Sequence, residues 1–374
     1  MQQKRDAASA LVYTAGLTLR EACLQASSLL EAAGVEEARA NAELLLLHLL
    51  DIERAQLLRD WREPLPAERW EAWRELIGRK AAGEPAQYII GEGWFYGRPF
   101  AVTPSVLIPR PETELLVEAV LAEADRLWPA AAGVAVGRSA ELGELKTRAA
   151  ADQTTGGEAE RGVSQGGATP GVDGITERRA AALADSSGAT PTVLDIGTGS
   201  GAIALTLAAE RPAWRVWASD LSTDALAMAA ANASRLGVDG RVSFVQGDLL
   251  LPFTVNGETG VPDTGRGTTA GLAADIVVSN PPYIPAGDLP ELQREVRDYE
   301  PRLALDGGDD GLDPYRRMVE QLQSLSRLPR IVAFELGKGQ AREVARLLED
   351  RYAWREVRII EDYAGIERHV IAVR

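Results

Sequence analysis

The 374-residue sequence contains a single cysteine, Cys23, and only two histidines, His48 and His369. One cysteine excludes an intrachain disulfide and a thiolate-rich zinc site. Two histidines leave little scope for acid–base or metal chemistry based on imidazole. We therefore expect a protein that works without a metal ion.

Long apolar runs are also absent. A membrane-spanning helix needs about 18 or more apolar residues in a row, whereas the best run, residues 44–50, is interrupted by His48 and flanked by acidic residues. The first residues lead into no apolar signal-peptide core, so export is not expected. These absences favour a cytoplasmic protein with no membrane partner.

Basic residues are scarce relative to acidic ones: 40 Lys and Arg stand against 55 Asp and Glu, a net charge of −15. Nucleic-acid binding draws its affinity mainly from clustered cations, so this balance disfavours a nucleic-acid partner. The length is sufficient for two domains. An enzyme that acts on a small molecule or on another protein fits these numbers better.

Residues 1–86 are predicted to form a small helical domain, of which residues 1–16 are expected to be a flexible tail. Thr18 and Glu21 have the spacing of a capping box, and Gly34 marks the end of the helix that they begin. Apolar residues recur with helical spacing in this region. The expected helices cover residues 19–33, 38–50 and 66–82.

Residues 87–106 are predicted to form a connecting hairpin. Strand-forming residues, beginning with Tyr88, Ile89 and Ile90, are interrupted there by glycines. Residues 107–374 follow as the second domain, with a first helix expected over residues 113–127.

Two segments of this second domain are predicted to be disordered insertions. Residues 131–190 hold no aromatic residue, and alanine and glycine supply 25 of the 60 positions. Residues 254–274 contain five glycines and no aromatic residue. Such segments bury too little apolar surface to offset the backbone entropy lost on ordering.

The rest of the second domain alternates short runs rich in Val and Ile with helical patterns. That order predicts an α/β fold, a doubly wound and mostly parallel sheet with helices on both faces. A final pair of strands, residues 354–360 and 368–373, is expected to close one edge as a hairpin. The other expected strands are residues 193–196, 216–219, 242–246, 275–279 and 331–336, with helices such as 224–236 and 314–325 between them.

A glycine-rich turn follows the first of these strands. Its glycines permit a tight turn from strand to helix and let the backbone approach a ligand. The next strand ends at Asp220, whose carboxylate can accept hydrogen bonds from ribose hydroxyls. The spacing of these glycines is equally compatible with a site for a dinucleotide and with a site for S-adenosylmethionine. The turn comprises Gly197, Thr198, Gly199, Ser200 and Gly201.

Asn280, Pro281, Pro282 and Tyr283 follow the strand over residues 275–279. The Asn280 side-chain oxygen and the Pro281 carbonyl can both accept hydrogen bonds from one –NH2 group, and consecutive prolines stiffen the loop. Tyr283 offers a flat face for a planar group. This pattern suits methylation of a planar, conjugated nitrogen by an aligned methyl donor, without a general base. It therefore favours S-adenosylmethionine over a dinucleotide.

With these motifs in place, the chain resembles the peptide chain release factor glutamine methyltransferases, also called the HemK or PrmC family. The resemblance implies a class I, Rossmann-like methyltransferase domain and a helical domain that recognises the substrate. It implies methylation of the glutamine side-chain nitrogen in the Gly-Gly-Gln motif of release factors, in a protein expected to be a monomer. The matching stretches are residues 83–91, 107–114, 299–312, 334–337 and 362–368.

The resemblance also implies roles for individual residues. Asn280, Pro281 and Tyr283 would be catalytic and, with Pro282, would hold the glutamine amide. Residues 110–114 would border the active site. The expected ligands of S-adenosylmethionine are Gly197, Thr198, Gly199, Ser200, Gly201, Asp220, Asp248 and Asn280.

Three positions qualify this assignment. Asp248 follows the third strand, where it either contacts adenine or is simply a solvated carboxylate. Leu249 stands where some members of the family have an aromatic residue, and Trp94 stands where an acidic residue is common. Leu249 therefore leaves open what packs on the adenine.

Two other functions remain as alternatives. The first is an amino-methyltransferase acting on adenine or guanine in nucleic acid, which shares the Asn-Pro-Pro-Tyr pattern but predicts a basic face or a base-recognition domain. The second is a non-catalytic protein that retains S-adenosylmethionine or a nucleotide as a regulator. Such a regulator would not need a loop that grips an amine.

Overall fold

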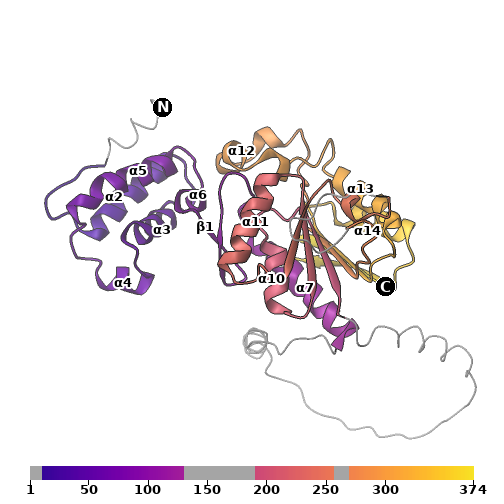
Figure 1. Ribbon diagram of the computed structural model, residues 1–374. Helices are drawn as coiled ribbons and strands as arrows, with labels where there is room; N and C mark the ends of the chain where they lie inside the picture. The colour runs from indigo at the N-terminus through magenta and orange to yellow at the C-terminus, as the bar shows by residue number, and fades with distance from the viewer. Residues whose placement is uncertain (1–10, 130–189, 257–268) are drawn as a thin grey trace, which may run out of the picture.

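The computed structural model describes residues 11–129, 190–256 and 269–374 (Figure 1). The predicted tail and both predicted insertions lie mostly outside these ranges. Within the described ranges, no helix combines the length and apolar character needed to cross a bilayer.

The N-terminal part, indigo to purple in Figure 1, is helical, as predicted. The Thr18 hydroxyl accepts from the Glu21 N–H, and the Glu21 carboxylate accepts from the Thr18 N–H, so the capping box is formed. Trp73, Ile77 and Leu45 are fully buried where the longest helices meet. These elements are α2 (Leu19–Ala32), α3 (Ala38–Leu50), α4 (Arg54–Arg59), the 3-10 turn η1 (Ala67–Arg69) and α5 (Trp70–Ala81).

The prediction that Tyr88, Ile89 and Ile90 belong to a strand was wrong. They lie in a short helix, α6 (Ala86–Ile90), which Gly91 ends with a φ of 82°. Ile89 and Ile90 pack on the helical core, whereas the Tyr88 hydroxyl donates to the Val106 carbonyl. The three side chains are thus held by two different parts of the protein, and this packing outweighs their intrinsic preference for a strand. The hairpin comprises only β1 (Glu92–Phe95) and β2 (Arg98–Ala101).

The predicted doubly wound sheet is confirmed. Among the described residues its seven strands have the order β5-β4-β3-β6-β7-β9-β8, with all neighbours parallel except the last two pairs. Every residue of the interior strand β3 is buried, as a strand covered on both faces requires. The strands are β3 (Thr192–Ile196), β4 (Arg215–Asp220), β5 (Val242–Gln246), β6 (Ile276–Ser279), β7 (Ile331–Glu335), β8 (Glu356–Glu361) and β9 (Glu367–Val373).

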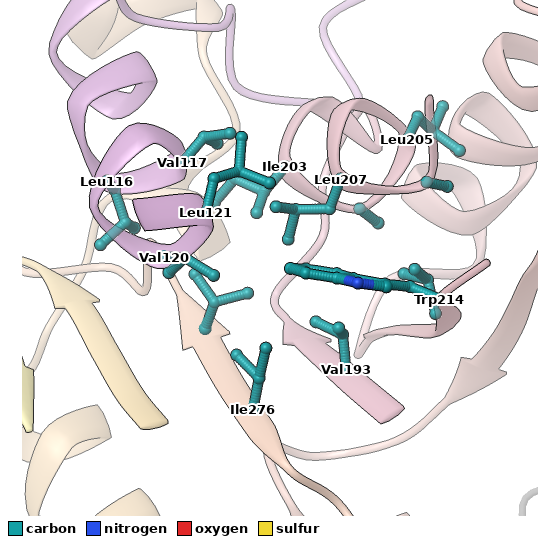
Figure 2. Packing of buried hydrophobic residues seen from close by; sticks show 14 of the residues in the cluster. Leu116, Val117, Val120, Leu121, Val193, Ile203, Leu205, Leu207, Trp214 and Ile276 are labelled. Atoms are coloured by element: carbon teal, nitrogen blue, oxygen red, sulfur yellow. The ribbon is translucent and has the colours of Figure 1, made fainter. Parts of the chain in front are cut away.

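Two hydrophobic cores hold helices against the two faces of this sheet. Figure 2 shows the first core, in which α7 side chains such as Val120 and α10 side chains such as Leu207 meet Val193 and Ile276 of the sheet. On this face lie α7 (Pro111–Leu127), α10 (Ala202–Glu210) and α11 (Thr223–Arg235); on the other lie α13 (Asp313–Gln321) and α14 (Ala341–Arg351). Shorter elements are η3 (Leu251–Phe253), η4 (Leu289–Glu291), α12 (Arg294–Tyr299), η5 (Arg302–Ala304) and η6 (Leu322–Ser324).

The strand order reverses between β3 and β6. The chain runs outward from β3 through β4 to β5 and then returns to β6 on the other side of β3. Ile196 and Ser279 are paired at the carboxyl ends of these strands, and the Ser279 hydroxyl donates to the Ile196 carbonyl. Ligands of such sheets bind at this reversal. The glycine turn and the Asn-Pro-Pro-Tyr loop therefore emerge side by side.

The short helix α12 connects the sheet domain to the N-terminal helices. The Lys80 ammonium, only 1% exposed, pairs with the Glu295 carboxylate at 2.5 Å. The Tyr299 hydroxyl also donates to the Ala82 carbonyl at 3.2 Å. Burial lowers the pKa of Lys80, although Glu295 opposes that shift. A buried ammonium group thus depends on one carboxylate from the other domain.

This dependence predicts unequal costs for removing the two partners. Glu295→Ala should lower the free energy of unfolding by about 3–5 kcal/mol, because it leaves a buried ammonium unpaired. Lys80→Met should cost less, since Glu295 is 33% exposed and regains contact with water. Urea denaturation measures both changes. Glu71→Ala, which breaks an exposed pair with Arg74, is the control, and an equal loss in Glu295→Ala and Glu71→Ala would contradict the prediction.

Candidate functional site

A cavity of about 610 Å³ lies at the carboxyl ends of β3, β4, β5 and β6. This volume is within the usual range for small-molecule sites. Gly201, Pro281 and Tyr283, which the sequence analysis also assigned to the site, do not line this cavity. The predicted residues that do line it are Gly197, Thr198, Gly199, Ser200, Asp220, Asp248, Asn280 and Pro282.

The glycines of the turn serve two different purposes. Gly197 and Gly199 have φ values of 72° and 56°, and a Cβ on either would meet no atom within 4 Å. Their backbones therefore border open space that a ligand can fill. Gly201 differs, because a Cβ there would lie 2.8 Å from Leu205 Cδ1. Gly201 lets α10 begin at this point and is a packing residue rather than a wall of the cavity.

Asp220 ties the end of β4 to the glycine turn. One of its carboxylate oxygens accepts from the Gly199 N–H and the other from the Ser222 N–H, each at 2.9 Å. Burial raises the pKa of Asp220, and these hydrogen bonds oppose the rise. Each carboxylate oxygen still has a lone pair for a ligand hydroxyl. Asp220 can therefore stabilise the glycine turn and bind a ligand at the same time.

The sequence analysis did not assign a role to Asp195, the buried carboxylate beneath this turn. Its Oδ2 accepts from the Thr198 hydroxyl at 2.7 Å and from the Ala204 N–H at 3.1 Å. Its Oδ1 has no partner among the described residues. Burial raises the pKa of Asp195 to about 7. An acidic residue inside an otherwise apolar strand was the signal that could have revealed it.

The cavity is also bordered by Asp248, Leu249 and Arg317. The Asp248 carboxylate forms an ion pair with Arg317 of α13, so it is not simply solvated in this structure. Leu249 lines the cavity in a left-handed conformation, with a φ of 51°. A branched residue in this region of φ is strained. Leu249, which stands where some relatives have an aromatic residue, is therefore a conformationally constrained part of the cavity wall.

The loop over residues 280–283 is held in place along its backbone. The Gln340 side chain donates to the Tyr283 carbonyl at 2.9 Å. One residue further on, the Ile284 N–H donates to the Leu305 carbonyl, and the Gly307 N–H donates to the Ile284 carbonyl. The loop is thus fixed both by its prolines and by the segment that follows η5.

Asn280 lies between the large cavity and a second one of about 270 Å³. Pro282 lines the large cavity, and Tyr283 lines the small one together with Leu292 and Val296. Residues lining both cavities are Leu107, Arg110, Asn280 and Ala304. Two ligands that occupied the two cavities would therefore both contact this group of residues, which includes Asn280.

Tyr283 forms a neutral wall of the small cavity. Burial raises the pKa of Tyr283 to about 12, so its phenol keeps its proton near neutral pH. A Cβ on Gly337 would lie 3.2 Å from Tyr283 Cδ2, which shows how closely the ring packs on that glycine. A phenol that keeps its proton is unsuited to act as a general base.

Arg110 and Glu300 form an ion pair beside both cavities, at 2.6 Å. The Glu300 side chain is only 2% exposed, and burial raises its pKa while Arg110 opposes the rise. Sequence analysis placed Arg110 at the border of the site but gave Glu300 no role. The two residues are far apart in the chain, so only the fold shows that they are partners.

Two family models match parts of this chain. A family model described as the PrmC N-terminal domain matches residues 21–91, and a model described as a methyltransferase domain matches residues 193–257.

Relatives named release factor glutamine methyltransferase match nearly the whole chain. The relative from Moorella thermoacetica is 37% identical over 96% of this chain and 99% of its own length. Those from Bacillus cereus and Bacillus subtilis are each 35% identical, over 94% and 95% of this chain and 98% of their own lengths.

Among solved structures, the hMettl16 catalytic domain in complex with a 3'UTR hairpin has a TM-score of 0.43 at 13% identity. That match covers 80% of this chain and 82% of the solved one. A likeness of this degree carries no statement about substrate.

Asp195 predicts how stability changes with pH. Its pKa is about 7 in the folded protein and about 3.9 in an unfolded chain. Between these values the folded state binds more protons, so stability falls as pH rises from about 4 to about 7. Urea denaturation between pH 5 and pH 8 should show a steeper decline in the wild type than in Asp195→Asn. Asp239→Asn, an exposed control, should follow the wild type; identical slopes in wild type and Asp195→Asn would contradict the prediction.

Proposed function

The chain belongs to the family of release factor glutamine methyltransferases, and we propose that it transfers a methyl group from S-adenosylmethionine to a glutamine of a release factor. The acceptor is the side-chain nitrogen of the glutamine in the Gly-Gly-Gln motif. The observation that carries this proposal is the position of Asn280 between two cavities, at the point where the strand order reverses.

The large cavity fits S-adenosylmethionine. Gly197 and Gly199 border open space that their missing side chains leave free, and Asp220 lies at the end of β4 to accept from ribose hydroxyls. Asp248 also lines this cavity, where it would contact the adenine. When bound there, S-adenosylmethionine supplies an activated methyl group. Thr198 and Ser200 complete the wall on the side of the glycine turn.

Asn280 and Pro281 would activate the acceptor nitrogen. An amide nitrogen is a poor nucleophile, because its lone pair is delocalised into the carbonyl. The Asn280 Oδ1 and the Pro281 carbonyl can each accept one hydrogen of the –NH2 group, which raises electron density on the nitrogen and fixes its direction. Alignment of this kind supplies a large part of the acceleration of a two-substrate reaction. The nitrogen loses its proton only after it has attacked the methyl group. The reaction therefore does not need Tyr283, which keeps its own proton, to act as a base.

The N-terminal helices would bind the release factor. Most of their apolar side chains form their own core, but Leu24, Leu44 and Leu58 are at least 40% exposed. The Lys80–Glu295 pair fixes these helices to α12, whose Val296 lines the small cavity. A factor held by the helices would thus lie beside the cavity that receives its glutamine. We place this reaction in the cytoplasm, with the enzyme acting as a monomer.

Asp220 should control affinity for S-adenosylmethionine. Asp220→Ala removes a ribose acceptor and both hydrogen bonds that shape the turn. We expect the dissociation constant to rise at least about tenfold, which corresponds to ~1.4 kcal/mol. Isothermal titration calorimetry measures it, with Asp239→Ala as an exposed control. Unchanged affinity in Asp220→Ala would mean that the donor is held elsewhere.

Asn280 should separate catalysis from donor binding. When radiolabelled S-adenosylmethionine is incubated with the protein, a release factor and duplex DNA together, label should enter only the Gly-Gly-Gln glutamine. Asn280→Ala should reduce transfer by about 10²-fold or more, since the acceptor is no longer oriented. Its affinity for S-adenosylmethionine should stay within a factor of about three, because other residues form most of the donor cavity. Label in the DNA would instead establish a nucleic-acid methyltransferase.

A further inference from the structure

Thr113 contacts the side chain of Asn280 from a different part of the fold. It lies in the first turn of α7, is 4% exposed and lines the large cavity. The Asn280 Nδ2 donates a hydrogen bond to the Thr113 Oγ1 at 3.2 Å. The two residues are 167 positions apart in the chain, so α7 and the carboxyl end of β6 jointly create this contact.

In this structure the contact engages the nitrogen end of the Asn280 amide. With Nδ2 bonded to Thr113, no donor in the described part of the chain engages Oδ1, which can accept from a ligand amine. If the amide were turned over, its –NH2 group would face the –NH2 group of the acceptor. Two hydrogen-bond donors would then face each other, and the glutamine –NH2 group that accepts the methyl would lose one of its two hydrogen bonds.

Thr113 is itself held firmly. Its side chain is branched at Cβ and therefore stiff, and its N–H donates to the Arg110 carbonyl at 3.2 Å. The next turns of α7 bury Leu116, Val117 and Val120 in the first core, as Figure 2 shows. Just before α7, the ion pair of Arg110 with Glu300 fixes the start of the helix. A hydroxyl on such an element can hold a neighbouring side chain in place.

We propose that Thr113 is a positioning residue, which keeps the Asn280 amide turned so that Oδ1 faces the glutamine nitrogen. This inference rests on the proposed function. Thr113 acts through Asn280, and its hydroxyl, rather than its bulk, is the required feature.

The test compares Thr113→Val, which keeps the shape and removes the hydroxyl, with Thr113→Ser, which keeps the hydroxyl. Thr206→Val is the matched control: Thr206 is also a buried helical threonine, but it lies within α10, does not line the cavity, and its hydroxyl has no partner among the described residues. Methylation of the release factor is measured at saturating S-adenosylmethionine, and donor affinity is measured by calorimetry.

We expect Thr113→Val to lower kcat by roughly 10- to 100-fold, the scale of a misplaced reacting group. Its affinity for S-adenosylmethionine should change by less than about twofold, since Asn280 is a small part of that cavity. Thr113→Ser and Thr206→Val should keep kcat within about threefold of the wild type. A merely structural role would lower donor affinity and melting temperature together with kcat.

Three results would overturn the proposal: near-normal kcat in Thr113→Val, an equal loss in Thr113→Ser, or a parallel loss of donor affinity. If Thr113→Val does not fold, Thr113→Ala removes the same hydroxyl with less bulk and is judged by the same criteria. A wild-type enzyme that leaves the release factor unmethylated would count against the proposed function instead. The two failures are therefore distinguishable.

Discussion

The pairing of β3 with β6 is the constraint on which the rest of this structure depends. The two strands are parallel neighbours in space but are separated in the chain by β4 and β5, so their carboxyl ends lie next to each other. One end leads into the glycine turn and the other into Asn280. Both segments could exist in a different sheet order, but they would then face different ligands. Methyl transfer needs donor and acceptor in contact, and the strand order places the two segments that we propose to bind them side by side.

Several contacts then make the meeting point rigid. Asp220 holds the glycine turn, and Gln340 holds the backbone of Tyr283. Thr113 reaches Asn280 from α7, which is packed across the same sheet. Preorganisation of this kind spares the reaction the cost of ordering its groups. The helical domain takes part through Lys80, because its partner Glu295 lies in the helix that forms one wall of the small cavity.

Much of this arrangement could be predicted from the sequence, because it is determined by residues that are close together in the chain. Buried strands appear as Val- and Ile-rich runs, and the capping box at Thr18 needs only neighbouring residues. The helix at Tyr88 was missed, because its burial between two cores decides its conformation. The Arg110–Glu300 pair could not be predicted either, since the two side chains meet only in the folded chain. Likewise, Asn280 was found as a motif, but its place between two cavities was not.

The chemistry proposed for Asn280 and Pro281 can be observed in a structure of the enzyme bound to S-adenosylhomocysteine and a release factor. The glutamine nitrogen should lie within hydrogen-bond distance of the Asn280 Oδ1 and the Pro281 carbonyl, and should face the sulfur in the large cavity. A glutamine whose nitrogen points away from residues 280–283, or a sulfur atom outside that cavity, would show that methyl transfer takes place by a different arrangement.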